Sequence, residues 1–191
     1  RLPLMGSAET QLVLHTFNDT AAEYPRQECV HDLVTAQAAK TPDAVALEWC
    51  SDTMSFAELH ACAAQVAAWL VAHGVAPDGV VALQLSRSLE QVVGVYGVLL
   101  SGGAYLPLDP AWPLERRQFM MEDAACGWLL AQSTHVDEHA SWFAGASLAL
   151  DDARCLPSAA LQETMVHSLN VSSAKLAYVM YTSGSTGKPK G

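Results

Sequence analysis

The alternation of helix-like segments with short apolar runs is the feature that most constrains this fold. Apolar residues recur at three-and-four spacing in some segments, and short, mostly apolar runs separate them. The expected helices cover 30–40, 56–73, 89–100 and 113–127, and the expected strands cover 44–49, 80–85, 104–108, 128–131, 147–150 and 176–181. Because such an alternation builds βαβ units, the sequence predicts an α/β fold with a largely parallel sheet.

Local signals set several of these boundaries. Ser55 followed by Glu58 predicts a capping box at the start of the helix 56–73, and Gly74 with Pro77 predicts its end. The helix 89–100 has apolar residues all round its surface, so we expect it to be buried on every side. By contrast, Arg116-Arg117 and Glu122-Asp123 are interpreted as the solvated side of the next helix.

Composition and charge exclude several classes of protein. The chain has 191 residues, 51% of them hydrophobic, which fits a globular domain. A net charge of -10 argues against a nucleic-acid or anionic-membrane surface. Five cysteines without a C-x-x-C pair indicate reduced, mostly buried thiols, and no signal peptide or membrane span is visible. We therefore expect a cytoplasmic protein.

Positive charge is concentrated at the end of the chain. The last acidic residue is Glu163, and three of the four lysines follow it. An acidic chain with a purely basic tail predicts a local anion site. Two of these three lysines, Lys188 and Lys190, lie in a glycine- and hydroxyl-rich segment, residues 181–191, directly after the apolar run 176–180. Lys175 lies just before that run.

This tail segment has the composition of a phosphate-binding loop. Gly184 and Gly187 allow backbone N–H groups to turn toward an anion, while the hydroxyl side chains add donors and the lysines add charge. Two residues separate the glycines and Pro189 follows Lys188, so the segment is not a Walker A loop. From these residues alone, a flexible Gly/Ser linker is about equally consistent. The candidate phosphate-binding residues are Thr182, Ser183, Gly184, Ser185, Thr186, Gly187, Lys188 and Lys190.

Three motifs, in order, resemble a known family. Residues 181–191 (YTSGSTGKPKG) resemble the phosphate-loop signature of adenylate-forming, AMP-binding enzymes. Residues 54–59 (MSFAEL) and 99–110 (LLSGGAYLPLDP) resemble the first two core motifs of the adenylation domains of nonribosomal peptide synthetases. The resemblance implies that this chain is the N-terminal part of the large subdomain of such an α/β enzyme. It also implies that the enzyme is an AMP-forming ligase.

The resemblance also implies a reaction and its partners. ATP with Mg²⁺ would convert an amino acid, or a related carboxylic acid, to an acyl-adenylate, which is then loaded onto the phosphopantetheine of a carrier domain. Residues 1–29 resemble a linker from an upstream condensation domain, and 30–191 an adenylation domain truncated in the phosphate loop. The family's catalytic lid lysine lies beyond Gly191, so the catalytic residue is unknown and we expect the fragment alone to be inactive.

Two other functions remain as alternatives. The first is activation of a fatty or aryl acid by an acyl-CoA synthetase, and the second is a non-catalytic scaffold or docking fragment. No metal site is predicted. His135 to His139 matches a zinc pattern, H-x-x-E-H, but is interpreted as a solvated polar segment, and Asp151-Asp152 as a strand-end turn.

Overall fold

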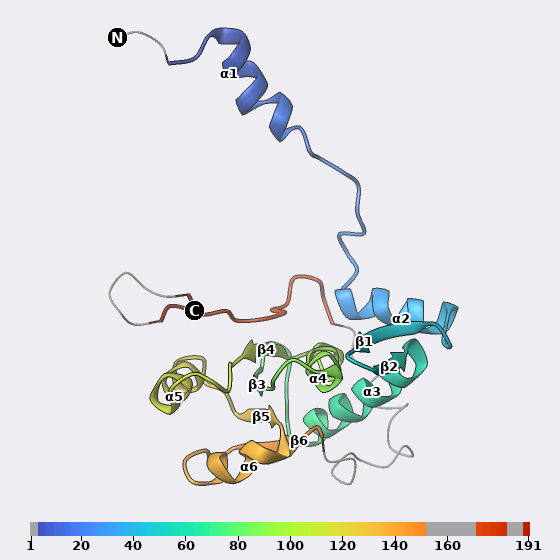
Figure 1. Cartoon of the computed structure of the whole chain (residues 1–191), viewed down its shortest axis with the longest axis vertical. Helices are drawn as coiled ribbons and strands as arrows, with labels where there is room; N and C mark the ends of the chain where they lie inside the picture. The colour runs from blue at the N-terminus through green and yellow to red at the C-terminus, as the bar shows by residue number, and fades with distance from the viewer. Residues whose placement is uncertain (1–3, 152–170, 183–188) are drawn as a thin grey trace.

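The structure, a computed structural model, describes residues 4–151, 171–182 and 189–191, without the side chains of residues 136–138 (Figure 1). Helices and short strands alternate along the described chain, as the sequence predicts. The helices are α1 (Ser7–Leu14), the 3-10 helix η1 (Thr16–Asn18), α2 (Val30–Lys40), α3 (Phe56–Ala72), α4 (Leu89–Leu100), α5 (Leu114–Asp123) and α6 (Ser133–Ala140). The strands are β1 (Val45–Trp49), β2 (Asp52–Ser55), β3 (Val80–Gln84), β4 (Ala104–Pro107), β5 (Trp128–Ala131) and β6 (Ala146–Ala149).

The central sheet is parallel, which confirms the predicted fold class. Its four strands lie in the order β4-β3-β5-β6, and each neighbouring pair is parallel. The chain passes from β3 through α4 to β4, and then through α5 back to β5 on the other side of β3. This order places β3 inside the sheet (Figure 1). Because the neighbouring strands are parallel, all four strands end at the same edge.

Alternate residues of the strands build two apolar cores, one on each face of the sheet. Val81 and Leu83 of β3 pack with α3 and α4, whereas Ala82 between them packs with α5. Successive side chains of a strand point to opposite faces, so each strand contributes to both cores. The molecule is therefore a helix–sheet–helix arrangement, the usual solution for a buried parallel sheet.

The segment after residue 175 extends this sheet beyond β4. The backbone N–H of Tyr105 donates a hydrogen bond to the Ala177 carbonyl at 3.1 Å, and the Tyr105 carbonyl accepts a hydrogen bond from the Val179 N–H at 3.0 Å. The bridge between Tyr105 and Tyr178 is parallel, so the segment runs in the same direction as β4. The predicted strand 176–181 is thus present as a short parallel bridge whose end lies at the carboxyl edge of the sheet.

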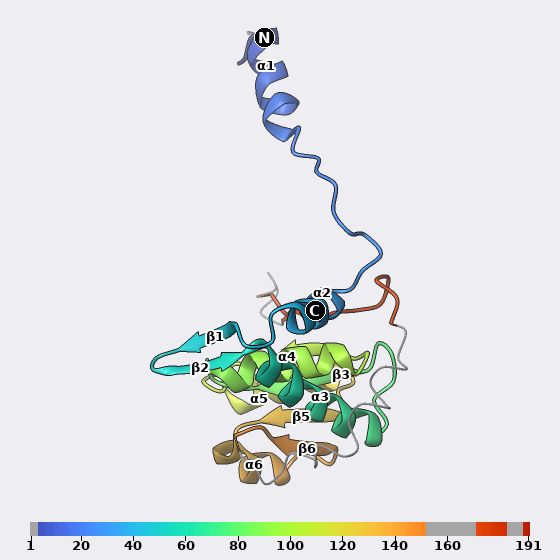
Figure 2. The ribbon, with the colours of Figure 1, turned by 90° about the vertical axis from the view of Figure 1, so that its right-hand side faces the viewer.

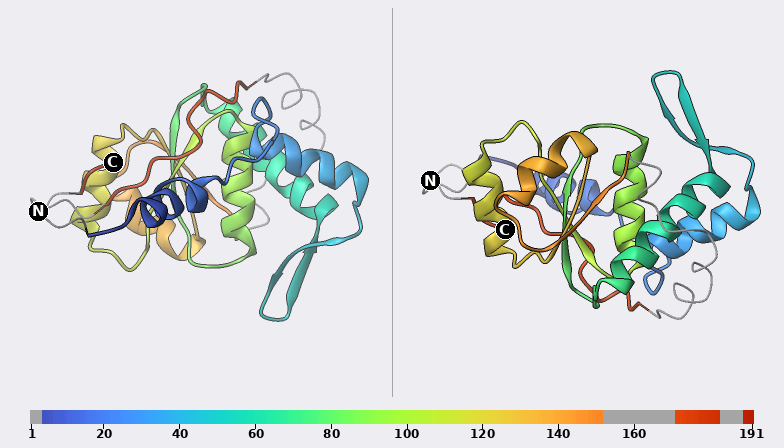
Figure 3. Two further views of the ribbon diagram at one scale, coloured as in Figure 1. Left: turned by 90° about the horizontal axis from the view of Figure 1, so that it is seen from above. Right: turned by 90° about the horizontal axis from the view of Figure 1, so that it is seen from below.

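The predicted strand 44–49 has a partner that the sequence analysis missed. β1 and β2 form a separate antiparallel hairpin, which extends away from the rest of the molecule (Figure 3). Cys50 adopts a left-handed backbone conformation, with φ 56°, in the turn that joins them. Because β2 is four residues long and three of these residues are polar, its sequence carries little strand signal.

Three burial predictions need correction. α4 is largely buried, but Val92 on it is 39% exposed. Arg117 is only 5% exposed rather than solvated, and its Nε donates to the Trp112 carbonyl at 3.0 Å. The thiols are also less buried than expected: Cys50 is exposed, and the other three described cysteines are half-buried. In each case tertiary packing, not helical or sequence pattern, determines exposure.

The N-terminal segment lies away from this body. Helix α1 contains no buried residue, and extended chain separates it from α2 (Figures 1 and 2). By contrast, α2 buries His31 and Ala38 against the body. None of the helices among the described residues is long and apolar enough to cross a membrane.

Candidate functional site

The two described ends of the phosphate-loop motif are joined by hydrogen bonds. The Thr182 N–H donates to the Lys190 carbonyl at 2.9 Å, and the Lys190 N–H donates to the Thr182 carbonyl at 3.1 Å. This reciprocal pair is an antiparallel bridge. The other predicted site residues, Ser183, Gly184, Ser185, Thr186, Gly187 and Lys188, lie outside the described residues. These two hydrogen bonds therefore hold the two ends of the motif next to each other.

Tyr181 anchors this pair to the body of the molecule. Its hydroxyl donates to the Asp123 carboxylate, at the end of α5, with an O–O distance of 2.5 Å. Burial, followed by the hydrogen bond to Asp123 and its negative charge, raises the pKa of Tyr181. A Cβ on Gly191 would lie only 2.7 Å from the ring of Tyr181, so the chain passes close against the ring. Tyr181 thus packs closely against the end of the described chain.

A cleft of about 640 Å³ opens at the carboxyl edge of the sheet, where β3 and β4 end. The chain leaves β3 toward α4 on one face and leaves β4 toward α5 on the other face. In open α/β sheets, such a reversal leaves a crevice in which ligands bind. Polar groups of Arg87, Gln91, Asp109 and His135 line the cleft together with Trp112. The sequence analysis did not identify this cleft, because it depends on strand order.

The beginning of the loop-bearing segment is held by a second acidic residue. Asp78, in the turn before β3, accepts the Lys175 ammonium at 2.7 Å on one oxygen and the Leu176 N–H at 2.9 Å on the other. The hydrogen bonds from Lys175 and then from Leu176 lower the pKa of Asp78. Sequence reasoning missed Asp78, since 97 residues separate it from Lys175.

The zinc pattern and the paired aspartates have structural explanations. His139 is 1% exposed, which corrects the expectation of a solvated segment, and its ring meets Trp142 edge-on at 5.3 Å. Asp151 accepts the backbone N–H of Ser133 at 2.6 Å and its hydroxyl at 2.9 Å. This strand-end carboxylate therefore caps α6, while Asp152 lies outside the described residues.

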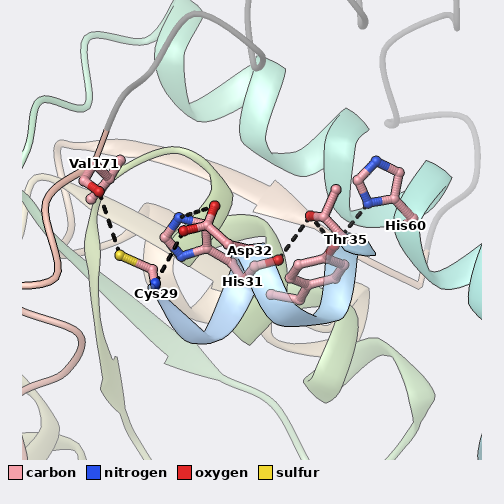
Figure 4. Close-up of polar contacts among 7 residues, drawn as sticks. Cys29, His31, Asp32, Thr35, His60 and Val171 are labelled. Atoms are coloured by element: carbon pink, nitrogen blue, oxygen red, sulfur yellow. Dashed lines mark hydrogen bonds and ion pairs between the residues drawn. The ribbon is translucent and has the colours of Figure 1, made fainter. Parts of the chain in front are cut away.

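One group among the described residues has metal-ligand chemistry that the sequence analysis did not single out. The side-chain ligand atoms of Cys29, His31 and Asp32 lie within 4.8 Å of one another (Figure 4). The Asp32 carboxylate accepts the Cys29 N–H at 3.0 Å, and the Cys29 thiol donates to the Val171 carbonyl at 3.4 Å. Burial raises the pKa of Cys29, which opposes the thiolate that a metal requires. We therefore assign the cluster to capping of α2.

A parallel α/β sheet, with the two described ends of a glycine- and hydroxyl-rich segment at its carboxyl edge, is typical of a nucleotide-binding domain. Residues 34–191 match the family model for AMP-binding enzymes. Since this match covers most of the chain, the chain belongs to the AMP-binding enzyme family, as its motifs predict.

Curated relatives identify the branch. Gramicidin S synthase 2 of Aneurinibacillus migulanus is 39% identical over 197 aligned positions, which cover 100% of this chain and 4% of that protein. Tyrocidine synthase 3 of Brevibacillus parabrevis is 39% identical over 183 residues, 96% of this chain and 3% of that protein. The chain thus spans a small part of the curated relatives that it matches.

Solved structures agree in fold. The nonribosomal peptide synthetase FmoA3 in its α-methyl-L-serine-AMP bound form is 32% identical with a TM-score of 0.77, over 94% of this chain and 19% of that one. Its AMPPNP-bound form gives 31% identity and a TM-score of 0.76, over 90% of this chain and 18% of that one. The predicted resemblance to the N-terminal part of a peptide-synthetase adenylation domain is confirmed.

Proposed function

We propose that this chain supplies the ATP-phosphate loop of an adenylation domain that activates an amino acid in nonribosomal peptide synthesis. The observation that carries the proposal is the antiparallel bridge between Thr182 and Lys190, which holds both ends of the motif together at the carboxyl edge of a parallel sheet. The AMPPNP and amino-acid-AMP forms of FmoA3 support a nucleotide and an amino acid as ligands.

The chemistry of the motif fits this role. Backbone N–H groups and hydroxyls of Thr182 to Thr186 would hold the β- and γ-phosphates of ATP, and Mg²⁺ would supply positive charge that offsets the charge of the phosphates. Lys188 and Lys190 would offset the charge that builds on the departing pyrophosphate. The protein does little covalent chemistry in such a step, so positioning and charge stabilisation provide most of its contribution.

The acyl-adenylate would then pass its acyl group to the phosphopantetheine thiol of a carrier domain. The proposed partners are this carrier domain and an upstream condensation domain, joined through a linker at residues 1–29. The relatives are peptide synthases of which this chain spans only a few per cent, and their length supports a multidomain context.

ATP–pyrophosphate exchange tests the proposal in the full-length protein that contains this chain. We expect Thr186→Ala and Lys190→Ala each to slow amino-acid-dependent exchange by about 10²- to 10³-fold, the usual cost of removing one donor aimed at transition-state charge. The thermal midpoint should stay unchanged, since the loss is in the reaction step.

Exposed residues outside the motif provide matched controls. Thr53→Ala on β2 and Lys40→Ala at the end of α2 should leave exchange unaltered. Wild-type rates in both loop variants would refute the phosphate role. Exchange that requires a fatty or aryl acid instead of an amino acid would assign the protein to acid activation for coenzyme A. The absence of exchange with any acid would indicate the scaffold alternative.

A further inference from the structure

The segment that carries the phosphate loop has few backbone contacts with the sheet. Among the described residues, two backbone hydrogen bonds join it to β4, both through Tyr105. A full ladder would fix the register of an edge strand, but two bonds specify it weakly. Other contacts must therefore determine where Thr182 arrives.

Register matters here because the two faces of the segment differ. Val179 and Tyr181 pack against the core beneath α5, whereas Leu176, Tyr178 and Met180 are each 52% exposed. A slip of one residue would exchange these faces. It would also turn the Tyr181 hydroxyl away from Asp123 and displace the Thr182–Lys190 pair.

Asp78 is built to hold the start of this segment. Its backbone has φ +68°, a left-handed conformation that is strained for a residue with a side chain, although Asp tolerates it better than most. The turn is fixed by the Asp78 N–H, which donates to the Gly102 carbonyl at 3.3 Å, and by the Gly79 carbonyl, which accepts the Ala104 N–H at 2.9 Å. The carboxylate therefore projects from a turn attached to β4.

Both oxygens of this carboxylate are directed at the same short stretch of chain. One accepts the Lys175 ammonium at 2.7 Å and the other the Leu176 N–H at 2.9 Å. A bond to a backbone N–H fixes the position of the chain itself, and the ion pair adds charge-assisted strength. Asp78 thus holds the segment at Leu176, and Asp123 holds it at Tyr181.

We propose that Asp78 is a positioning residue for the phosphate loop, which fixes the register of residues 176–182 through Lys175 and the Leu176 N–H. The inference rests on the proposed phosphate role of the loop. Asp78 acts through the strand and does not itself touch the phosphates. Its carboxylate holds the chain at Leu176. About 20 Å of extended strand separates this point from Thr182.

Hydrogen exchange of the full-length protein, measured by mass spectrometry, tests the positioning directly. Asp78→Gly is the informative variant because glycine suits the left-handed turn while the carboxylate is lost. We expect about tenfold faster exchange in peptides that cover 176–182. Peptides that cover 80–84 and 128–131, in the centre of the sheet, should exchange at the wild-type rate.

Three further variants refine the result. Asp78→Asn keeps a carbonyl oxygen for the Leu176 N–H, so we expect a smaller increase in exchange than for Asp78→Gly. Lys175→Met removes only the ion pair and should also give a smaller increase. Asp52→Asn, on the exposed hairpin β1–β2, is the matched control and should change nothing.

The outcomes separate this inference from the proposed function. Faster exchange at residue 176 alone, equal acceleration in all peptides, or no change would each overturn the positioning role. In the exchange reaction with ATP, Asp78→Gly should lower activity about tenfold. If the wild-type protein lacks that activity, the proposed function fails, while the hydrogen-exchange result still decides the role of Asp78.

Discussion

At the scale of single residues, Asp78 provides a prediction about pH. Its contacts with Lys175 and the Leu176 N–H lower its pKa below the ordinary value of 3.8. The stability that these contacts provide is therefore present above pH 3.8 and is lost as the pH falls through the lowered pKa. A carboxyl carbon NMR titration should place the Asp78 midpoint below this ordinary value, and Lys175→Met should move it upward. A midpoint at or above the ordinary value would contradict the assignment.

At the scale of elements, the close approach of α3 and α4 is governed by Gly97. A Cβ there would lie 2.6 Å from the Val66 Cβ and 3.0 Å from the Ala63 carbonyl oxygen, which cannot move aside easily. We expect Gly97→Ala to lower the free energy of unfolding by about 1 to 3 kcal/mol despite the better helix propensity of Ala. Gly94→Ala is the control, because the nearest atoms are the ends of the Leu150 and Leu85 side chains. Urea unfolding of both variants measures the difference, and an equal loss in both would refute steric control by Gly97.

At the scale of the whole molecule, the body of the protein begins at α2. Helix α1 has no buried residue. By contrast, α2 is joined to the body by hydrogen bonds: the Thr35 hydroxyl is hydrogen-bonded to the Tyr96 hydroxyl at 2.9 Å, and the Tyr96 hydroxyl is hydrogen-bonded to the His60 ring at 2.8 Å (Figure 4). Deletion of residues 1–28 should therefore leave the thermal midpoint unchanged, while deletion through residue 40 should lower it. Scanning calorimetry measures both. A lower midpoint after the shorter deletion would show that the N-terminal segment packs on the body.

The sequence alone determined most helices and strands of the α/β body and the chemistry of the motif, because both depend on neighbouring residues. Helical spacing and the Ser55–Glu58 capping box predicted α3, and the order of apolar runs predicted a parallel sheet. The glycines, hydroxyls and lysines of residues 182–190 predicted a phosphate loop, which remains a proposal.

Only the tertiary structure decided which distant residues support that loop. Asp78 and Asp123 are ordinary acidic residues in sequence, and their roles appear only when strand order brings them beside residues 175–181. The hairpin partner of β1 was missed because β2 is short and mostly polar, whereas the burial of Arg117 and His139 was missed for the same reason as the roles of Asp78 and Asp123. Packing between segments that are remote in sequence sets these features, and no local pattern encodes it.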